Sequence, residues 1–454
     1  MTDRVDVVII GAGVAGLAAA CRLARAGATT ALLEARDRVG GRIYTVRDER
    51  TPVPIELGAE FVHGSAPEIA ELARRAKLAV CDIHGQRWQA HGGRLTPVDD
   101  DAFWKDLGRV MSRLDPKRTP DRSFEEFLDT KPGGPALARQ RTLAREFVQG
   151  FHAADLSRIS ERSLADGGAP DDEDEERQAR ILDGYDRIAH ELAATASGVR
   201  LAHQVREVVW EPGTVEVRCS RPGGGSSALT ARAAIVTVPL GVLQQTRGPS
   251  AITFTPDVDD TRRAASQLAM GTVARITLLF REPFWEAKSL RRKTGGRSLA
   301  ELSFLHSSDD DVPTWWTAGP VRAATLVGWA GGAKAARLVG RGAAELEARA
   351  IAACARLFGM RRSRLESLVE ECWYHDWDDD PHTLGAYSYA LVGGSTAAER
   401  LARPVAGTLF FAGEAADAEG RTGTVHGAIG TGYRAAAAVA SLTMNRSRAR
   451  RGHR

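Results

Sequence analysis

The apolar and polar positions near the N-terminus follow two patterns, one typical of buried strands and one of an amphipathic helix. "VDVVII" (5–10) is a nearly continuous apolar, β-branched run, as expected of a strand inside a parallel sheet. "VAGLAAACRLARAG" (14–27) carries an apolar stripe at helical spacing and ends in glycine. "TTALLE" (29–34) predicts the next strand. The order strand, helix, strand indicates a parallel βαβ unit.

The strand pattern returns in two later segments of the chain. Within 181–250, "VEVRCS", "RPGGGSS" and "ALTARAAIVTVP" predict a strand, a hairpin loop and a second strand. Within 400–445, "GTLFFAG" predicts a buried strand and "TVHGAIGTGYRAAAAVASL" predicts an alanine-rich closing helix. We therefore expect 1–80, 181–250 and 400–445 to form one discontinuous α/β domain.

The intervening segments, 81–180 and 251–399, are expected to form a second, α+β domain. The first is helix-rich by pattern and ends in the acidic run "DGGAPDDEDEER", which we interpret as a solvated loop. The second opens with the strand "ARITLLF" and contains the helix-like "GAAELEARAIAACARLF". The basic tail, 446–454, is expected to be disordered.

Composition narrows the class of protein. The 454 residues are 43% hydrophobic and 26% charged, and the net charge of +3 is too small to indicate nucleic-acid binding. The five cysteines are scattered without CxxC spacing, which indicates neither a zinc site nor a disulfide framework and favours a cytoplasmic location. No run of about 18 apolar residues is present, so we expect no membrane association. A monomer or a homodimer is expected.

A glycine-rich turn joins the first strand to the first helix. Gly11, Gly13 and Gly16 would let the backbone approach a pyrophosphate at the helix N-terminus. Glu34 ends the next strand, where its carboxylate can bind a ribose diol and would repel a 2′-phosphate. The ligand is therefore predicted to be FAD or NAD rather than NADP. FAD is favoured because "EARDRVGGR" adds a second glycine pair and Arg42, which can bind phosphate oxygens.

Seven blocks together resemble the flavin-containing amine oxidase family, which includes monoamine oxidases, polyamine and spermine oxidases and lysine-specific histone demethylases. The blocks are "GAGVAG", "LLEARDRVGGR", "ELGAEFVHG", "TVPLGVL", "FREPFW", "WDDDPHTLGAYSY" and "FFAGEAADAEGRTGTVHGAIGTGYRAA". They span nearly the whole chain in family order. The resemblance implies a Rossmann-like FAD-binding domain, made of the three segments above, and an α+β substrate-binding domain.

Together the motifs and the resemblance imply a set of cofactor-binding residues. These are Gly11, Gly13, Ala15, Gly16, Glu34, Ala35, Arg36, Gly41, Arg42, Gly58, Ala59, Glu60, Phe61, Val205, Thr237, Trp377, Gly413, Glu414, Thr424 and Val425. Thr424 and Val425 would begin the closing helix, whose start carries roughly half a positive charge. That charge would face the pyrimidine edge of the flavin. Since "AGEAADAEGRTGT" has no cysteine, non-covalent FAD is expected.

The resemblance also implies the reaction, in which the flavin takes a hydride from the carbon that bears an amine. Water then hydrolyses the imine, and O2 reoxidises the flavin. The candidate catalytic residues are His63, Arg275, Tyr387 and Thr424. Arg275 stands where family members usually have lysine, which puts fast reoxidation in doubt. His63 and the presence of Thr424, in place of a second aromatic wall, favour a polyamine-like substrate.

Other interpretations remain open. The chain could be an oxidase or dehydrogenase of an amino acid or of a specialised metabolite, although Glu60 and His63 stand where an amino-acid oxidase typically has an arginine. It could also be a non-catalytic flavoprotein. Trp315, Trp316 and Trp329 could line the pocket or fill the core.

Overall fold

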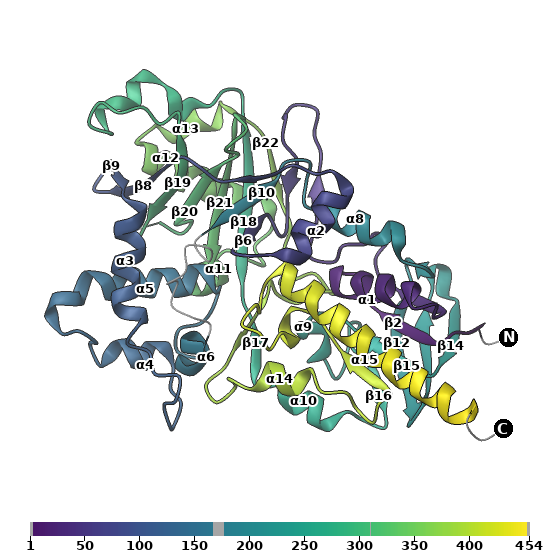
Figure 1. The fold of residues 1–454 in the computed structure, drawn as a ribbon. Helices are drawn as coiled ribbons and strands as arrows, with labels where there is room; N and C mark the ends of the chain where they lie inside the picture. The colour runs from purple at the N-terminus through teal and green to yellow at the C-terminus, as the bar shows by residue number, and fades with distance from the viewer. Residues whose placement is uncertain (1–2, 167–176, 309, 452–454) are drawn as a thin grey trace.

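The computed structural model describes residues 3–166, 177–308 and 310–451, arranged in two halves (Figure 1). A five-stranded parallel sheet forms the centre of the first half, in the order β11-β3-β2-β15-β24. Its strands are β2 (Val7–Ile10), β3 (Thr30–Leu33), β11 (Val199–Arg200), β15 (Ala233–Val236) and β24 (Leu409–Phe411). All positions of β2, β3, β15 and β24 are buried because both faces of this sheet are covered.

Helices α1 (Val14–Arg25), α8 (Asp186–Thr195) and α15 (Val425–Arg451) cover one face of this sheet. Figure 1 shows α1 and α15 side by side. Their close approach requires a glycine, since a Cβ at Gly432 would lie 2.1 Å from the carbonyl oxygen of Ala15. The first and last parts of the chain therefore form one helical layer.

A second five-stranded sheet covers the other face, in the order β1-β14-β13-β12-β16. Its strands are β1 (Asp3–Arg4), β12 (Gln204–Glu211), β13 (Thr214–Ser220), β14 (Ser226–Ala231) and β16 (Thr253–Thr255). Its outward positions are more polar than its inward ones, as expected of a sheet with one solvated face.

A seven-stranded sheet forms the second half, in the order β22-β18-β21-β20-β19-β8-β9. Its strands are β8 (Gln86–His91), β9 (Arg94–Val98), β18 (Val273–Phe280), β19 (Leu302–Ser307), β20 (Thr314–Thr317), β21 (Thr325–Gly331) and β22 (Val369–Tyr374). β18 is buried throughout, and α12 (Ala343–Phe358) packs against the same core.

A helical group completes the second half and lies on the left of Figure 1. Its members are α3 (Asp100–Met111), α4 (Phe124–Asp129), α5 (Ala138–Phe151) and α6 (Glu161–Asp166). A small sheet links the halves through β6 (Phe61–His63), β7 (Val80–Asp82) and β10 (Gln178–Ile181). Shorter elements of the structure include α2 (Pro67–Ala76), α11 (Gly332–Ala336) and β23 (Ser388–Ala390).

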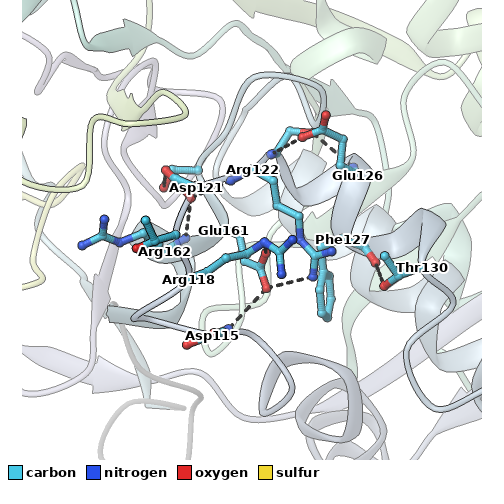
Figure 2. A network of polar contacts seen from close by, with 12 residues as sticks. Asp115, Arg118, Asp121, Arg122, Glu126, Phe127, Thr130, Glu161 and Arg162 are labelled. Carbon is cyan, nitrogen blue, oxygen red and sulfur yellow. Dashed lines mark hydrogen bonds and ion pairs between the residues drawn. The ribbon is translucent and has the colours of Figure 1, made fainter.

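Ion pairs and hydrogen bonds to a buried carboxylate connect the segments of this helical group. Glu161 is fully buried, and Figure 2 shows Arg118 and Arg122 converging on it. The guanidinium of Arg122 binds both carboxylate oxygens, and the backbone N–H of Asp115 donates to Oε1 at 3.3 Å. Nearby, the carboxylate of Asp121 accepts the Ser160 hydroxyl at 2.7 Å. The network ties the segment before α4 to the start of α6.

The three segments assigned to the α/β domain do meet in one parallel sheet, which confirms the predicted fold class. Two details differ from the predicted boundaries: β16 pairs with β12, beyond the boundary at 250, and β7 and β10 cross the boundaries at 80 and 180. Helix α15 extends as far as Arg451, into the segment 446–454 that we expected to be disordered, and 452–454 lie outside the described residues. Most of the acidic run, 167–176, lies outside the described residues.

Candidate active site

One cavity of about 1070 Å³ runs between the two halves. This volume exceeds the usual range of about 300–1,000 Å³ for small-molecule sites, which leaves room for a dinucleotide and a second ligand. Every residue that the sequence analysis assigned to the site lines this cavity, except Gly16. The sequence therefore predicts which side chains converge, whereas their individual roles stay predictions.

The glycine turn explains why Gly16 is absent from the lining. A Cβ on Gly16 would lie 1.9 Å from the carbonyl oxygen of Gly11, so this glycine allows the helix to pack on the turn. Gly13, in contrast, has ordinary extended backbone angles and open space where a Cβ would stand. Helix α1 begins at Val14 without a side-chain cap. Its free N–H groups therefore face a space that suits a pyrophosphate.

Glu34 lies at the carboxyl end of β3 and is held in a fixed orientation. Its Oε2 accepts the N–H of Ala12 at 2.7 Å, and its Oε1 accepts the N–H of Arg36 at 2.9 Å. The side chain of Arg36 turns to the protein, where it binds Asp380 at 2.6 Å and Thr383 at 2.8 Å. Glu34 is thus fixed at the position that suits a ribose, while Arg36 offers the cavity its backbone.

Arg42 and Glu414 form a buried pair across the cavity wall. Nη1 of Arg42 donates to Glu414 Oε1 and to the carbonyl oxygen of Ala386, both at 2.8 Å. Oε2 of Glu414 accepts the Ser388 hydroxyl at 2.7 Å and the N–H of Gly423 at 3.0 Å. The carboxylate of Glu414 therefore organises the loop before α15.

The start of α15 lies on the cavity and is capped by Thr424. The Thr424 hydroxyl accepts the N–H of Gly427 at 3.0 Å and donates to the carbonyl oxygen of Arg421 at 2.6 Å. Since the hydroxyl is used in this way, Thr424 fixes the helix start rather than forming a second wall of the substrate site. The N–H groups beyond it give this end of the cavity a partial positive charge.

Three further predicted residues hold the backbone around the cavity. Nε1 of Trp377 donates to the carbonyl oxygen of Leu57 at 2.8 Å. A Cβ on Gly58 would lie 1.9 Å from the carbonyl oxygen of Arg42, so Gly58 allows close strand packing there. Oγ1 of Thr237 donates to the carbonyl oxygens of the glycine turn, and Val205 borders the cavity at an irregularity in β12.

Arg275 takes part in a buried ion-pair network around Glu60. Nη2 of Arg275 binds Glu60 Oε2 at 2.6 Å, and Nη1 donates to the carbonyl oxygen of Gly58 at 3.0 Å. Arg180 and Nε1 of Trp316 bind the same carboxylate. Burial alone would raise the pKa of Glu60, but the two arginine charges outweigh it and lower the pKa. Nε of Arg275 is buried without a partner among the described residues.

His63 and Tyr387 lie on the part of the cavity wall formed by the second half. Burial lowers the pKa of His63 to about 4, so its imidazole is neutral at physiological pH. Its ring lies 5.5 Å from the ring of Phe151, and the Tyr387 hydroxyl donates to the carbonyl oxygen of Phe151 at 2.6 Å. Tyr387 therefore lines the cavity beside Phe151, and its place beside a flavin stays a prediction.

The sequence analysis missed most of the aromatic residues that line this end of the cavity. We define the aromatic wall as Phe61, Phe103, Trp104, Phe147, Phe151, Phe304, Trp316 and Trp329. Trp316 and Trp329 line the cavity, whereas Trp315 is fully buried in the core. A signal for this difference was available, since adjacent residues in a strand point to opposite faces.

Comparison with known proteins agrees with this geometry. A family model described as flavin containing amine oxidoreductase matches residues 14–440. The chain belongs to the flavin-containing amine oxidoreductase family. This amine oxidoreductase is 28% identical over 470 residues to polyamine oxidase 3 of Oryza sativa subsp. japonica, covering 95% of this chain and 88% of the relative. It is 28% identical over 467 residues to probable polyamine oxidase 4 of Arabidopsis thaliana, covering 95% and 86%.

Solved structures share the fold of the amine oxidoreductase. A structure of putrescine oxidase bound to putrescine matches with a TM-score of 0.79 and 22% identity, covering 97% of this chain and 100% of the other. Cyclohexylamine oxidase from Brevibacterium oxydans matches with a TM-score of 0.78 and 21% identity, covering 97% and 99%. The family and the fold together make this chain a flavin-dependent enzyme that oxidises amines. Within the described residues, no helix is both long and apolar enough to cross a membrane.

Proposed function

We propose that this enzyme binds FAD without a covalent bond and oxidises an amine at the carbon beside its nitrogen. The observation that carries the proposal is a single cavity that joins the glycine turn, Glu34 and the start of α15 to the aromatic wall. We call the part of the cavity around the glycine turn and Glu34 the nucleotide end, and the part along the aromatic wall the substrate end. The nucleotide end suits an adenine dinucleotide, and the cavity is large enough for a substrate beside it. No cysteine is among the described residues that line the cavity, which supports the proposed non-covalent binding. The five cysteines form no disulfide, as a cytoplasmic location would require.

The FAD would supply the hydride acceptor, and O2 would return it to its oxidised form. The residues of the chain would position the reactants. Uncapped N–H groups at the start of α1 would hold the pyrophosphate, and Glu34 would hold the ribose. The N-terminus of α15, fixed by Thr424, would stabilise negative charge. Tyr387 and the aromatic wall would exclude water and favour the neutral, reactive form of the amine.

Within the amines, a polyamine is one candidate substrate, suggested by the sequence resemblance and by the similarity to polyamine oxidases. An amino acid or a specialised metabolite is the alternative. We propose a monomer or a homodimer, which sedimentation of the purified protein would test.

Gly13 offers a test of the cofactor site that does not depend on turnover. Its backbone angles suit any residue and its Cβ would meet open space, so Gly13→Asp should fold. The new carboxylate would repel a pyrophosphate, and we expect flavin affinity to fall at least 100-fold. Gly225→Asp is the control, since Gly225 is exposed, also has extended backbone angles (φ −74°), and would place a Cβ 3.9 Å from the nearest non-neighbouring atom. Unchanged flavin content in Gly13→Asp would contradict the proposed site, and reduction by no amine would contradict the proposed reaction.

A further inference from the structure

The aromatic wall forms a continuous series of ring contacts along the cavity. On the helical side, Trp104, Phe147 and Phe151 follow one another, with ring centres 5.8 and 5.1 Å apart. On the sheet side, Phe61 lies 5.3 Å from Trp316, which in turn lies 6.0 Å from Trp329. His63 connects the two sides, since its ring contacts those of Phe61 and Phe151. Large apolar surface thus extends along the whole substrate end.

Rings alone would not separate an apolar amine from a polyamine, because aromatic faces also attract cations. In this wall, however, arginines of the protein already lie over the rings. The guanidinium of Arg87 lies 4.9 Å from the ring centre of Phe304 and 5.2 Å from that of Phe103. Arg275 lies 5.6 Å from Trp316 in the same way. Guanidinium groups of the protein therefore already lie over these rings, which leaves less ring surface for a second ammonium.

Arg180 completes this set, with its guanidinium 5.0 Å from the ring centre of Phe61. The nearby histidines are uncharged. Burial lowers the pKa of His63 and His152 to about 4, and burial together with the charge of Arg87 lowers the pKa of His306 to about 3. All three imidazoles are neutral at physiological pH.

The carboxylates of the cavity give a second ammonium little compensation. Among the described lining residues, the carboxylates are Glu34, Glu60, Glu146 and Glu414. Glu34 and Glu414 belong to the nucleotide end, and Glu60 is bound by two arginines. This leaves Glu146, which is exposed on α5. Removing an ammonium from water without a partner is costly, so a dication pays a penalty that a monoamine avoids.

We propose that the substrate end of the cavity selects a monoamine carried on an apolar aryl or alkyl body and discriminates against polyamines. The inference rests on the proposed function and departs from the polyamine preference of the sequence analysis. The reacting amine would be taken in its neutral form, while its apolar body would pack on the aromatic wall. No part of such a substrate would need a buried anionic partner.

The test uses the oxidised holoenzyme and two amines that differ in a single group, hexylamine and hexane-1,6-diamine. Anaerobic rapid mixing measures the loss of the flavin absorption band as a function of amine concentration. We expect the ratio of the limiting reduction rate to the dissociation constant to be at least tenfold higher for hexylamine. An equal or higher ratio for the diamine would overturn the inference and leave the proposed function intact. Reduction by neither amine would overturn the inference, whereas the proposed function would fall only if no amine of any class reduced the flavin.

A matched pair of variants examines whether charge on the wall sets the preference. Phe151 borders the cavity and is 45% exposed, so Phe151→Asp should fold and place a carboxylate beside the substrate. We expect it to reduce the preference for hexylamine at least threefold. Leu442→Asp adds the same charge at a residue that is 38% exposed on α15, away from the cavity lining, and should leave the ratio unchanged. A preference that is unaltered in Phe151→Asp would overturn the inference.

Phenylalanine and 2-phenylethylamine form a second pair, which differs by one carboxylate. The inference predicts faster reduction by 2-phenylethylamine, because Arg87 is already bound by Asp100 at 2.7 Å and contacts His306 at 3.0 Å. Faster reduction by phenylalanine would overturn the inference in favour of an amino-acid substrate.

Discussion

Glu60 and Glu161 are both buried carboxylates bound by two arginines, yet they occupy different surroundings. Glu161 lies inside the helical group, and its partners come from the neighbouring segment before α4. Glu60 lines the cavity, and its partners come from β10, β18 and β20. Similar groups of charges therefore have different effects. The network at Glu161 stabilises the helical group, and the network at Glu60 orders the wall of the cavity.

The comparison shows what a buried ion pair can and cannot indicate. Burial and pairing by themselves are weak evidence for function, since desolvation offsets much of the attraction. The difference lies in what each network touches. Arg275 fixes the carbonyl of Gly58, which borders the proposed flavin site, and it retains an unpartnered Nε there. Glu161 is not among the described residues that line the cavity.

The largest expected effect on stability comes from Glu161→Ala. The substitution removes a fully buried carboxylate and leaves Arg122, which is 18% exposed, and Arg118, which is 38% exposed, without it, so we expect a cost of about 3 kcal/mol, the lower end of the range for a broken buried pair. Urea unfolding should show this loss, while the flavin spectrum of the folded variant stays unchanged. Glu71→Ala removes an exposed pair with Arg74 and should cost less than about 1 kcal/mol. Equal losses of unfolding free energy in the two variants would show that the Glu161 network does not stabilise the helical group.

Glu60→Gln should have a smaller effect on unfolding but a clear effect on the flavin. The substitution keeps the shape of the side chain and removes the charge that holds Arg275 and Arg180. The backbone at Gly58 would become less fixed, and we expect flavin affinity to fall about tenfold, or about 1.4 kcal/mol. The visible spectrum and a flavin titration measure this change. An unaltered affinity would make the network at Glu60 structural, like that at Glu161.

Arg275→Lys tests the departure from the residue that is usual in the family. Lysine can lose its proton when buried, whereas arginine stays charged, so the variant should react with O2 several-fold faster. The rate of reduction by substrate should change less. Rapid mixing of the reduced enzyme with O2 measures the first rate, and anaerobic mixing with an amine measures the second. Arg122→Lys is the matched control in the other network, and an unchanged oxygen rate in Arg275→Lys would remove this residue from the mechanism.

The sequence predicted best what depends on local order along the chain. The glycine turn, the strand that ends at Glu34 and the closing helix follow from hydrophobic periodicity and capping, which neighbouring residues set. The sequence analysis assigned Arg275 a catalytic role. Glu60 as its partner was not foreseen, because β18 and the loop before β6 meet only in the folded chain.

Most of the aromatic wall was missed for the same reason. Its residues come from α3, α5, β6 and three strands of the seven-stranded sheet, and no spacing along the chain connects them. Trp315 and Trp316 form an exception, since alternation in a strand predicts that one is buried in the core when the other lines the cavity. Long-range packing, rather than local pattern, decides the substrate end.

The smallest expected effect is a loss of unfolding free energy in mild acid, which should arise at His63 beside the cavity and not at the Glu161 network. Burial lowers the pKa of His63 from its usual value near 6.5 to about 4, and the unfolded chain therefore binds a proton that the folded chain refuses. The stability that this histidine contributes is complete above pH 6.5 and is lost as the pH falls towards 4. Charged groups around His63 modify this only slightly, since the rings of Phe61 and Phe151 and the imidazole of His426 surround it.

The measurement is urea unfolding of the flavin-free protein between pH 7.5 and pH 4.5, for the wild type and for His63→Gln. Glutamine cannot take up the proton, so the variant should lose less stability over this range than the wild type. Arginines bind Glu161 and stay charged throughout, so Arg122→Lys should follow the wild-type slope. If the unfolding free energy of His63→Gln and of the wild type fell equally with pH, His63 would take up a proton in the folded state as readily as in the unfolded chain. The proposal of an uncharged substrate end that favours a monoamine would then be weakened.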